Sequence, residues 1–240
     1  MKKRLEIGYN FPVLVREEQL FNSDFESFSI MYLSDFHFNK YNGNLVLPII
    51  KIIQQYDPAI LLLGGDYVDT KGGFCHFTRL LYALSMRKNV FAVAGNHDYF
   101  YGINAIKESM LNNNIQWVEQ SSVIISIKDI MIQIDGNKLS NDKNDSNCFK
   151  ILCLHKPLNI KSITNNYHVA FAGHLHGCQC VLWENDKGLY PGRLFYPYNV
   201  LKTNVKNFHF YVSRGLSDTL PIRYNCSREA VLVRVGNDHN

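Results

Sequence analysis

Three short apolar runs in the first hundred residues each end in a cluster of polar side chains. The runs read as buried strands, and the clusters that follow them lie at 34–37, 64–66 and 95–98. Polar side chains at the mouth of a core strand are costly to bury unless something binds them. Stretches with helical periodicity separate the runs, which predicts a parallel sheet with crossover helices. Because open α/β sheets bind ligands at the carboxyl ends of their strands, the pattern predicts a site there.

The spacing of apolar residues also predicts the individual elements. Residues 1–27 are expected to form one or two strands, and 137–147 reads as an exposed loop. The expected helices lie between the first strands, over residues 45–56, 76–88 and 103–113. The second half is rich in strands. All expected strands after residue 27 are 28–33, 59–63, 90–94, 115–118, 123–127, 130–134, 150–154, 169–172, 179–183, 208–212 and 230–235.

Composition places the chain among globular proteins. Its 240 residues, 46% hydrophobic and 19% charged, suit a single domain over 1–240. The formal charge of +4 comes from scattered Lys and Arg, which argues against a nucleic-acid partner. No apolar run approaches the ~20 residues of a transmembrane helix, and only residues 1–4 form a basic cluster. We therefore expect a cytoplasmic protein, with peripheral contact to the inner membrane through that cluster as the alternative.

Six cysteines form no Cys-x-x-Cys pair, which is typical of reduced thiols in the cytosol. Cys178 and Cys180 are expected on one side of a strand, as small apolar groups. The alternative is a separate zinc site that they form with His174 and His176.

The polar residues at the strand ends combine carboxylates, an amide and imidazoles. Asp35 and His37 are two apart, so an extended backbone would aim both at one point. Mixed oxygen and nitrogen ligands suit two divalent cations ~3.5–4 Å apart, which together bind a hydroxide and phosphoryl oxygens. The complete candidate set is Asp35, His37, Asp66, Asn96, His97, Asp98, His155, His174 and His176.

These residues resemble the calcineurin-like metallophosphoesterase superfamily. Its pattern is Asp-x-His, Gly-Asp, Gly-Asn-His-Asp or Glu, a lone His, and Gly-His-x-His. The five blocks stand here in that order, at 35–37, 65–66, 95–98, 155 and 173–176. The resemblance spans residues 29–177 and implies an α/β fold, a four-layer α/β/β/α sandwich of two mixed sheets.

The resemblance also implies a role for each residue. One metal is expected on Asp35, His37, Asp66 and His176, and the other on Asp66, Asn96, His155 and His174. Asp66 would bridge the two ions. His97 would not be a ligand but would protonate the leaving group, and Asp98 would hold its ring. The expected cofactors are two divalent ions, Mn²⁺ first, with Fe or Zn²⁺ as alternatives.

The C-terminal part is similar to the YkuE-like branch of this superfamily. The similarity lies in segments 176–179, 211–216 and 220–226 and in Glu229, with Cys178 where the branch usually has glycine. One related line cleaves the pyrophosphate of UDP-diacylglucosamine in lipid A synthesis. Many members carry an N-terminal membrane helix, and we expect none here.

The expected function is therefore metal-dependent hydrolysis of a phosphodiester or pyrophosphate by a metal-bridged hydroxide. A UDP-2,3-diacylglucosamine pyrophosphatase type of enzyme is one candidate, and the substrate is expected to be a phosphate ester linked to a nucleotide or lipid. A phosphomonoesterase or protein phosphatase is one alternative, and a non-catalytic metal-binding scaffold is another. The complete ligand set and the His97-Asp98 pair favour catalysis.

Several residues outside the five blocks are expected to be structural. Asp69 reads as a turn acid, with a role in supporting a metal ligand as the alternative. Arg223 reads as a partner of a structural carboxylate, while Arg214 is open between structure and substrate phosphate. The aromatic segment 190–198 is expected to pack over the second sheet, with contact to a lipid or nucleoside as the alternative. The remaining histidines are expected at the surface or in packed positions: His76, His168 and His209.

Overall fold

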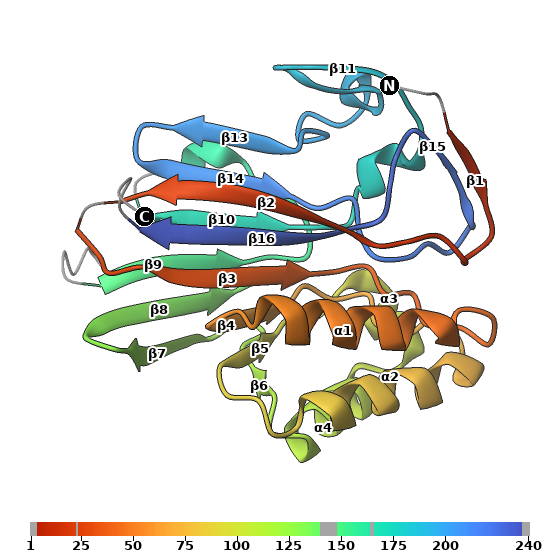
Figure 1. The fold of residues 1–240 in the computed structure, drawn as a ribbon, viewed down its shortest axis with the longest axis horizontal. Helices are drawn as coiled ribbons and strands as arrows, with labels where there is room; N and C mark the ends of the chain where they lie inside the picture. The colour runs from red at the N-terminus through yellow and green to blue at the C-terminus, as the bar shows by residue number, and fades with distance from the viewer. Residues whose placement is uncertain (1–3, 23, 140–147, 164–165, 237–240) are drawn as a thin grey trace.

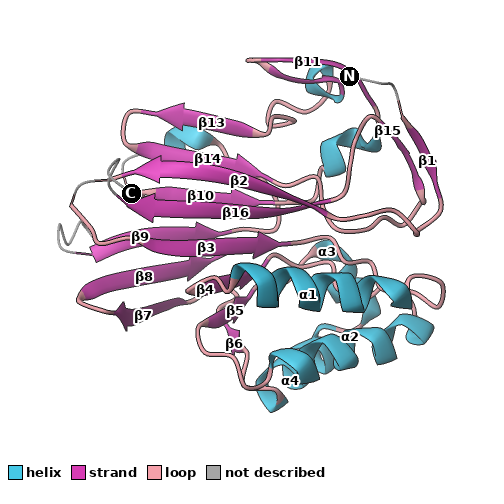
Figure 2. Cartoon of the chain, in the orientation of Figure 1, coloured by secondary structure: helices cyan, strands magenta, loops and turns pink. Residues whose placement is uncertain are grey.

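Two six-stranded mixed sheets lie face to face in the computed structural model (Figure 1), which describes residues 4–22, 24–139, 148–163 and 166–236. The α-helices gather on one side of the molecule, and strands make up most of the rest (Figure 2). The expected α/β sandwich of two mixed sheets is confirmed. Part of the expected loop, 140–147, lies outside the described residues.

The first sheet carries the three strands whose ends define the predicted site. Its order is β2-β16-β3-β4-β5-β6, and β3 to β6 are parallel to one another, as the helix–strand alternation predicts. Helices cover its outer face, which explains why β4 is four fully buried apolar residues in a row. The bounds are Leu14–Phe21 for β2, Glu229–Gly236 for β16, Phe28–Leu33 for β3, Ile60–Leu63 for β4, Val90–Ala92 for β5 and Gln116–Trp117 for β6.

The second sheet has the order β13-β14-β10-β9-β8-β7, with parallel pairing from β14 through β8. Aromatic side chains fill the space between the sheets, and the ring of Tyr32 stacks on that of Phe171 with centroids 5.5 Å apart. The bounds are Lys202–Val205 for β13, Phe208–Val212 for β14, Val169–Ala172 for β10, Cys148–Cys153 for β9, Ile130–Gly136 for β8 and Ser122–Ile127 for β7.

The helical layer belongs to the first sheet. Figure 1 shows α1 (Val46–Tyr56), α2 (Lys71–Leu84) and α4 (Ile103–Asn112) together on that side. The outer face of the second sheet is covered more thinly, by the 3₁₀ turn Ile160–Ser162 and by loops, in the part of the chain that is described.

Local structure departs from the sequence prediction in several places, which include three unexpected strands at 188–191, 202–205 and 222–224. A short helix, α3 (Asn96–Tyr101), precedes α4, because Gly102 at φ +136° separates the two. Helix α2 begins at Lys71, five residues before the expected start. The strand expected at 179–183 begins instead at Val181, because residues 176–179 form a 3₁₀ turn.

Two small antiparallel sheets complete the fold beside the sandwich. β1 (Leu5–Ile7) pairs with β15 (Ile222–Tyr224), and β11 (Val181–Asn185) pairs with β12 (Gly188–Pro191). The leading segment therefore supplies two strands, β1 and β2, that join different sheets.

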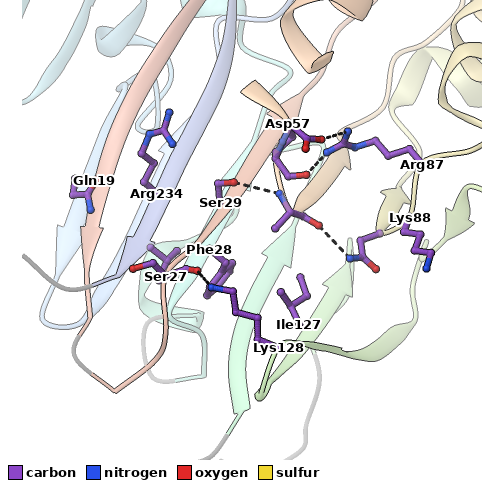
Figure 3. Close-up of a pocket in the computed structure, with 14 residues that line it drawn as sticks. Gln19, Ser27, Phe28, Ser29, Asp57, Arg87, Lys88, Ile127, Lys128 and Arg234 are labelled. Carbon is purple, nitrogen blue, oxygen red and sulfur yellow. Dashed lines mark hydrogen bonds and ion pairs between the residues drawn. The ribbon is translucent and has the colours of Figure 1, made fainter. Parts of the chain in front are cut away.

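A basic cavity of about 800 Å³ lies at the amino ends of β3, β4 and β5 (Figure 3). Its cationic side chains include Arg87, which bonds Asp57, and the exposed Lys88. The cavity is at the opposite ends of these strands from the predicted site and contains none of the candidate ligands.

Candidate metal centre

Strand ends from both sheets converge at one edge of the sandwich. Asp35 and His37 follow β3, and Asp66 follows β4 in the first sheet. His155 follows β9, and His174 follows β10 in the second. Their ligand atoms form groups within 4.8 Å of one another: Asp35, His37 and His176; His37, Asp66 and His97; and Asp66, His155 and His174.

The backbone reaches this arrangement through left-handed conformations rather than extended ones. Asp35 and His37 have φ of +58° and +43°, so the prediction that an extended backbone aims them at one point is wrong in its reason. Asp66, His174 and His176 are also at positive φ. Such conformations are uncommon for residues other than glycine and cluster at functional sites, where surrounding structure holds them.

One group of ligand atoms gathers around His37. Its Nε2 lies 3.2 Å from the Nε2 of His176 and 3.6 Å from Oδ2 of Asp66. The Nε2 of His176 is 3.5 Å from Oδ1 of Asp35. Four side chains thus face a common point, and three of them are almost fully buried.

The other group gathers around His155. Its Nε2 lies 3.3 Å from Oδ2 of Asp66 and 3.0 Å from Oδ1 of Asn96. His174 completes this group from β10. Oδ2 of Asp66 is the atom that lies near both His37 and His155, so Asp66 occupies the position between the two groups.

The hydrogen bonds at Nδ1 show that these imidazoles are arranged as ligands. Nδ1 of His37 lies 2.8 Å from Asp69, Nδ1 of His155 lies 2.8 Å from the carbonyl oxygen of Gly64, and Nδ1 of His176 lies 3.2 Å from Asp218. Each Nδ1 therefore donates a proton, which leaves the Nε2 lone pair facing inward. The Nε2 atoms of His37 and His176 are 3.2 Å apart, so they must share either a proton or a cation, and the residues fit a bound metal.

Without a cation, the negative charge of buried Asp66 would be compensated by the imidazoles of His155 and His37. Burial raises the pKa of Asp66, but the hydrogen bond from His155 and the charges of His155 and His37 bring it down to about 2. Burial lowers the pKa of His155, yet Asp66 outweighs it and raises that pKa to about 9. A carboxylate held ionised among imidazoles is a strong divalent-cation ligand.

Comparisons with known proteins agree with this geometry. Residues 28–193, more than half of the chain, match the model of the calcineurin-like phosphoesterase family. The chain belongs to this family. It is 22% identical to phosphodiesterase YaeI of Escherichia coli over 94% of this chain and 88% of that protein. It is 24% identical to an uncharacterized metallophosphoesterase of Aquifex aeolicus, over 81% of this chain and 74% of that protein.

A solved structure confirms the fold of this phosphoesterase. The calcineurin-like phosphoesterase YfkN from Bacillus subtilis superposes with a TM-score of 0.52 at 12% identity, over 79% of this chain and 82% of that one. In the residues that the model describes, no helix has both the length and the apolar character needed to span a bilayer.

The side chain that holds His97 in this phosphoesterase is Asp69. Nδ1 of His97 lies 2.9 Å from Oδ1 of Asp69, the same oxygen that accepts from His37. This hydrogen bond is the main reason why the pKa of His97 is raised. The prediction that Asp69 is only a turn acid is therefore wrong. The His97 side chain is 32% exposed, against 2% for that of His37, so His97 is the imidazole that solvent reaches.

Asp98 has a different role from the one the resemblance implies. Its carboxylate is fully buried and accepts the backbone N–H groups of Asp66, Tyr67 and Gly95. Burial raises its pKa to about 7 even though these hydrogen bonds lower it. Asp98 therefore fixes the loop that carries Asp66 against the start of α3, and the prediction that it holds the His97 ring is wrong.

A buried charge network behind His176 is the second feature that sequence reasoning missed. Asp218 accepts from Nδ1 of His176 and is held in turn by Arg223, with Nη2 at 2.7 Å. Burial raises the pKa of Asp218, but His176 and Arg223 lower it well below its usual range. The structural role expected for Arg223 is confirmed, while Asp218 is an isolated acid in a loop with no local pattern to mark it.

Three further predictions concern Arg214, Cys178 and the aromatic segment 190–198. Arg214 pairs with the buried Glu229, at 2.6 Å, which is a structural contact. Cys178 lies in a turn at φ +55° rather than on a strand, and none of the ligand groups among the described residues includes a cysteine. The aromatic segment packs over the second sheet only in part: Tyr198 packs against Phe210, with ring centroids 6.3 Å apart, whereas Leu194, Phe195 and Tyr196 are exposed.

Proposed function

We propose that this phosphoesterase hydrolyses a phosphodiester or pyrophosphate with the help of two divalent metal ions. The observation that carries the proposal is the inward orientation of three Nε2 atoms toward Asp35 and Asp66, each fixed by a hydrogen bond at Nδ1. Mn²⁺ is our first candidate, with Fe or Zn²⁺ as alternatives, because the ligand chemistry accepts all three.

The proposed division of ligands is the one the resemblance implies. Asp35, His37, Asp66 and His176 would hold one ion, and Asp66, Asn96, His155 and His174 the other. When bound, the ions would neutralise phosphoryl charge and make hydroxide available near neutral pH. The chain's own contribution is to hold each imidazole in one tautomer and orientation, as Asp69, Gly64 and Asp218 do.

His97 is the proposed proton donor to the departing oxygen. Its side chain is 32% exposed beside the ligand groups, and Asp69 holds its Nδ1, which leaves Nε2 for the proposed proton transfer. Asp98 contributes by fixing the loops around it. A cavity that opens at His97 leaves room for a second substituent on the phosphate, which favours a diester or pyrophosphate over a monoester. The phosphodiesterase name of the Escherichia coli relative supports the same choice.

The finer substrate class is also a proposal. A substrate linked to a lipid, including the UDP-2,3-diacylglucosamine type, is supported by the exposed apolar side chains at 194–196. Peripheral contact with a membrane would accompany such a substrate. A protein or monoester phosphatase and a non-catalytic scaffold are the competing functions.

The test is hydrolysis of bis-p-nitrophenyl phosphate against p-nitrophenyl phosphate, with added Mn²⁺ and a chelator control. We expect faster cleavage of the diester, which the chelator abolishes. Asp66→Ala should remove metal and activity together, while His97→Ala should keep most of the metal and lose rate by about 10²–10⁴-fold. Preference for the monoester would refute the diesterase assignment, and absence of cleavage by protein that holds two metals would favour the scaffold.

A further inference from the structure

A cavity of about 790 Å³ opens beside His97 and Asp69, on the outer side of the ligand groups. Its walls come from the loops around Tyr9 and Tyr41, from the start of α2 and from Phe100 on α3. We call it the Tyr41–Phe100 pocket. Because it begins at His97, whatever part of a substrate enters it must lie next to that imidazole.

Two aromatic side chains in this pocket are exposed to an extent that packing does not explain. Phe100 is 87% exposed and Tyr41 68% exposed. The ring of Phe100 stands edge-on to that of His97, with centroids 6.4 Å apart. Exposed aromatic faces beside a reactive group are suited to stacking on a flat ring of a ligand.

The charge of the pocket is positive at its mouth. Lys40 and Lys71 both line it, and neither forms an ion pair with another residue in the described part of the chain. Lys71 is the first residue of the fourteen-residue helix α2, and no side chain caps the start of this helix at Thr70. The carboxylate in the lining, Asp69, is already bound by His37, His97 and Thr219. The ammonium of Lys40 lies over one face of the Tyr41 ring, 4.7 Å from its centroid, and no carboxylate in the described part of the chain pairs with either lysine, so both can contact an anionic group.

We propose that the Tyr41–Phe100 pocket binds the leaving group, and that this group carries both a flat ring and a second anionic charge. The ring stacks on Phe100 and Tyr41, and the anion is bound by Lys40, Lys71 and the start of α2. A nucleoside monophosphate is the simplest group with both features. The assignment of this pocket to the leaving group rests on the proposed function, since it depends on His97 as proton donor. The proposed binding of a flat ring and an anion is independent of that function.

The test is calorimetric binding to the Mn²⁺-loaded protein of three probes: AMP, ribose 5-phosphate and adenosine. Ribose 5-phosphate keeps the phosphate and lacks the ring, so it also corrects for phosphate that binds at the metals. We expect AMP to bind about tenfold more tightly than either of the others, since one stacked base contributes about that factor. Phe100→Ala should bring the AMP to ribose 5-phosphate ratio close to one, and Lys40→Ala with Lys71→Ala should bring AMP close to adenosine.

Matched controls come from equally exposed residues elsewhere. Tyr82→Ala removes an aromatic ring that is 79% exposed near the other end of α2, and Lys88→Ala removes a lysine from the cavity at the opposite edge of the sheet. Both should bind the three probes as the unmodified protein does. An AMP to ribose 5-phosphate ratio of one in the unmodified protein would overturn the proposal, as would equal effects of Phe100→Ala and Tyr82→Ala.

Failure of this proposal can be told apart from failure of the proposed function. If the protein discriminates the probes as expected but cleaves no phosphodiester, the Tyr41–Phe100 pocket binds a ring and an anion as proposed. Its ligand would then not be the leaving group of a phosphodiester. A protein that cleaves the diester but binds AMP and ribose 5-phosphate equally would keep its function and refute the pocket.

Discussion

Asp69 holds a proposed metal ligand, His37, and the proposed proton donor, His97, with one carboxylate. Its Oδ1 accepts from both His37 and His97, and Thr219 donates to its Oδ2 at 3.0 Å. The two imidazoles are therefore fixed relative to each other by a side chain that need touch neither metal nor substrate. Asp98, two residues from Asn96, acts only on backbone N–H groups.

This difference gives the first prediction. Asp69→Asn should lower kcat by about 10–100-fold at saturating Mn²⁺, because the neutral amide no longer orients and stabilises both imidazoles. Asp98→Asn should instead lower the free energy of unfolding by about 1–3 kcal/mol. The NH₂ group of the new amide cannot accept a hydrogen bond, so at least one buried backbone N–H is left without an acceptor. Steady-state kinetics and chemical denaturation of both variants separate the two effects. Equal losses of kcat in folded, metal-loaded protein would contradict the assignment.

His168 supports a pH prediction away from the metal centre. Its Nδ1 accepts the backbone N–H of Lys150 at 2.9 Å, and its ring stacks on Phe149 with centroids 4.7 Å apart. Burial, and then the charge of Lys150, lower its pKa below the ordinary value of 6.5. The folded protein therefore holds this imidazole neutral.

The sign of the effect follows from this lowered pKa. Below pH 6.5 the unfolded chain binds a proton that the folded chain resists, so the contribution of His168 to stability is present above pH 6.5 and is lost as the pH falls through the folded pKa. We expect His168→Gln to flatten the pH dependence of unfolding in that window. The direct measurement is the NMR titration of the His168 ring, and a midpoint at or above 6.5 would refute the prediction.

At the scale of elements, strand β1 is tied to the metal centre by buried charges. Glu6 on β1 accepts from Arg228 at 2.8 Å, Arg228 reaches Asp218 at 3.4 Å, and Asp218 holds His176. Both Glu6 and Arg228 are buried. The short sheet of β1 and β15 is therefore held in place by an ion network more than by apolar burial, since Leu5 and Ile7 are exposed.

Breaking this buried network should lower the free energy of unfolding more than breaking an ion pair at the surface. Glu6→Gln leaves the Arg228 guanidinium without its closest carboxylate and should lower the free energy of unfolding by about 3 kcal/mol. Glu17→Gln is the matched control, because Glu17 pairs with Arg234 at the surface, where both are about half exposed, and it should cost about 0–1 kcal/mol. Chemical denaturation compares the two. Equal costs would show that the buried network carries no special weight.

The ends of the strands were predictable, whereas the groups that support the ligands were not. An apolar run followed by Asp-x-His or Gly-Asn-His-Asp shows locally which strand ends carry ligands. Asp69 and Asp218 lack such a local signal, because each acts through partners 28–42 residues away in the chain. The position of Asp69, three residues after Asp66 in the same loop, is the one hint that could have identified it.

Backbone conformation was equally hidden from the sequence. Positive φ is adopted by Asp35, His37, Asp66, His174 and His176. Asp and His are enriched at positive φ among residues other than glycine, but positive φ remains uncommon for them, so the residue type alone does not predict this conformation. Close packing of neighbouring chain provides the constraint. For example, Gly215 lies against the side chain of Asp35, and a Cβ there would approach the Asp35 Cβ to 2.7 Å. Such contacts exist only after both sheets have assembled.

At the scale of the whole molecule, the metal centre joins the two sheets. Asp35, His37 and Asp66 follow strands of the first sheet, and His155, His174 and His176 follow strands of the second, so each of the two proposed cations would cross-link the sandwich at one edge. Across the same interface, Tyr32 donates to the carbonyl oxygen of Leu154 at 2.7 Å. The assembly of the sheets creates the site, and a bound metal should in turn stabilise the assembly.

Metal binding should therefore raise the thermal stability of the protein, and the rise should depend on ligands from both sheets. Mn²⁺ at about 100 times its dissociation constant contributes about 2.7 kcal/mol, which for a chain of this size corresponds to a rise in Tm of about 5–10 °C. A chelator should reverse the rise, and Asp66→Asn should abolish most of it because Asp66 lies between both groups of ligands. His37→Ala and His155→Ala should each reduce it, whereas Lys88→Ala, at the opposite edge, should leave it unchanged. If His155→Ala and His176→Ala, which remove ligands that follow strands of the second sheet, both left the rise unchanged, the metal would be bound by the first sheet alone, and the centre would not join the sheets.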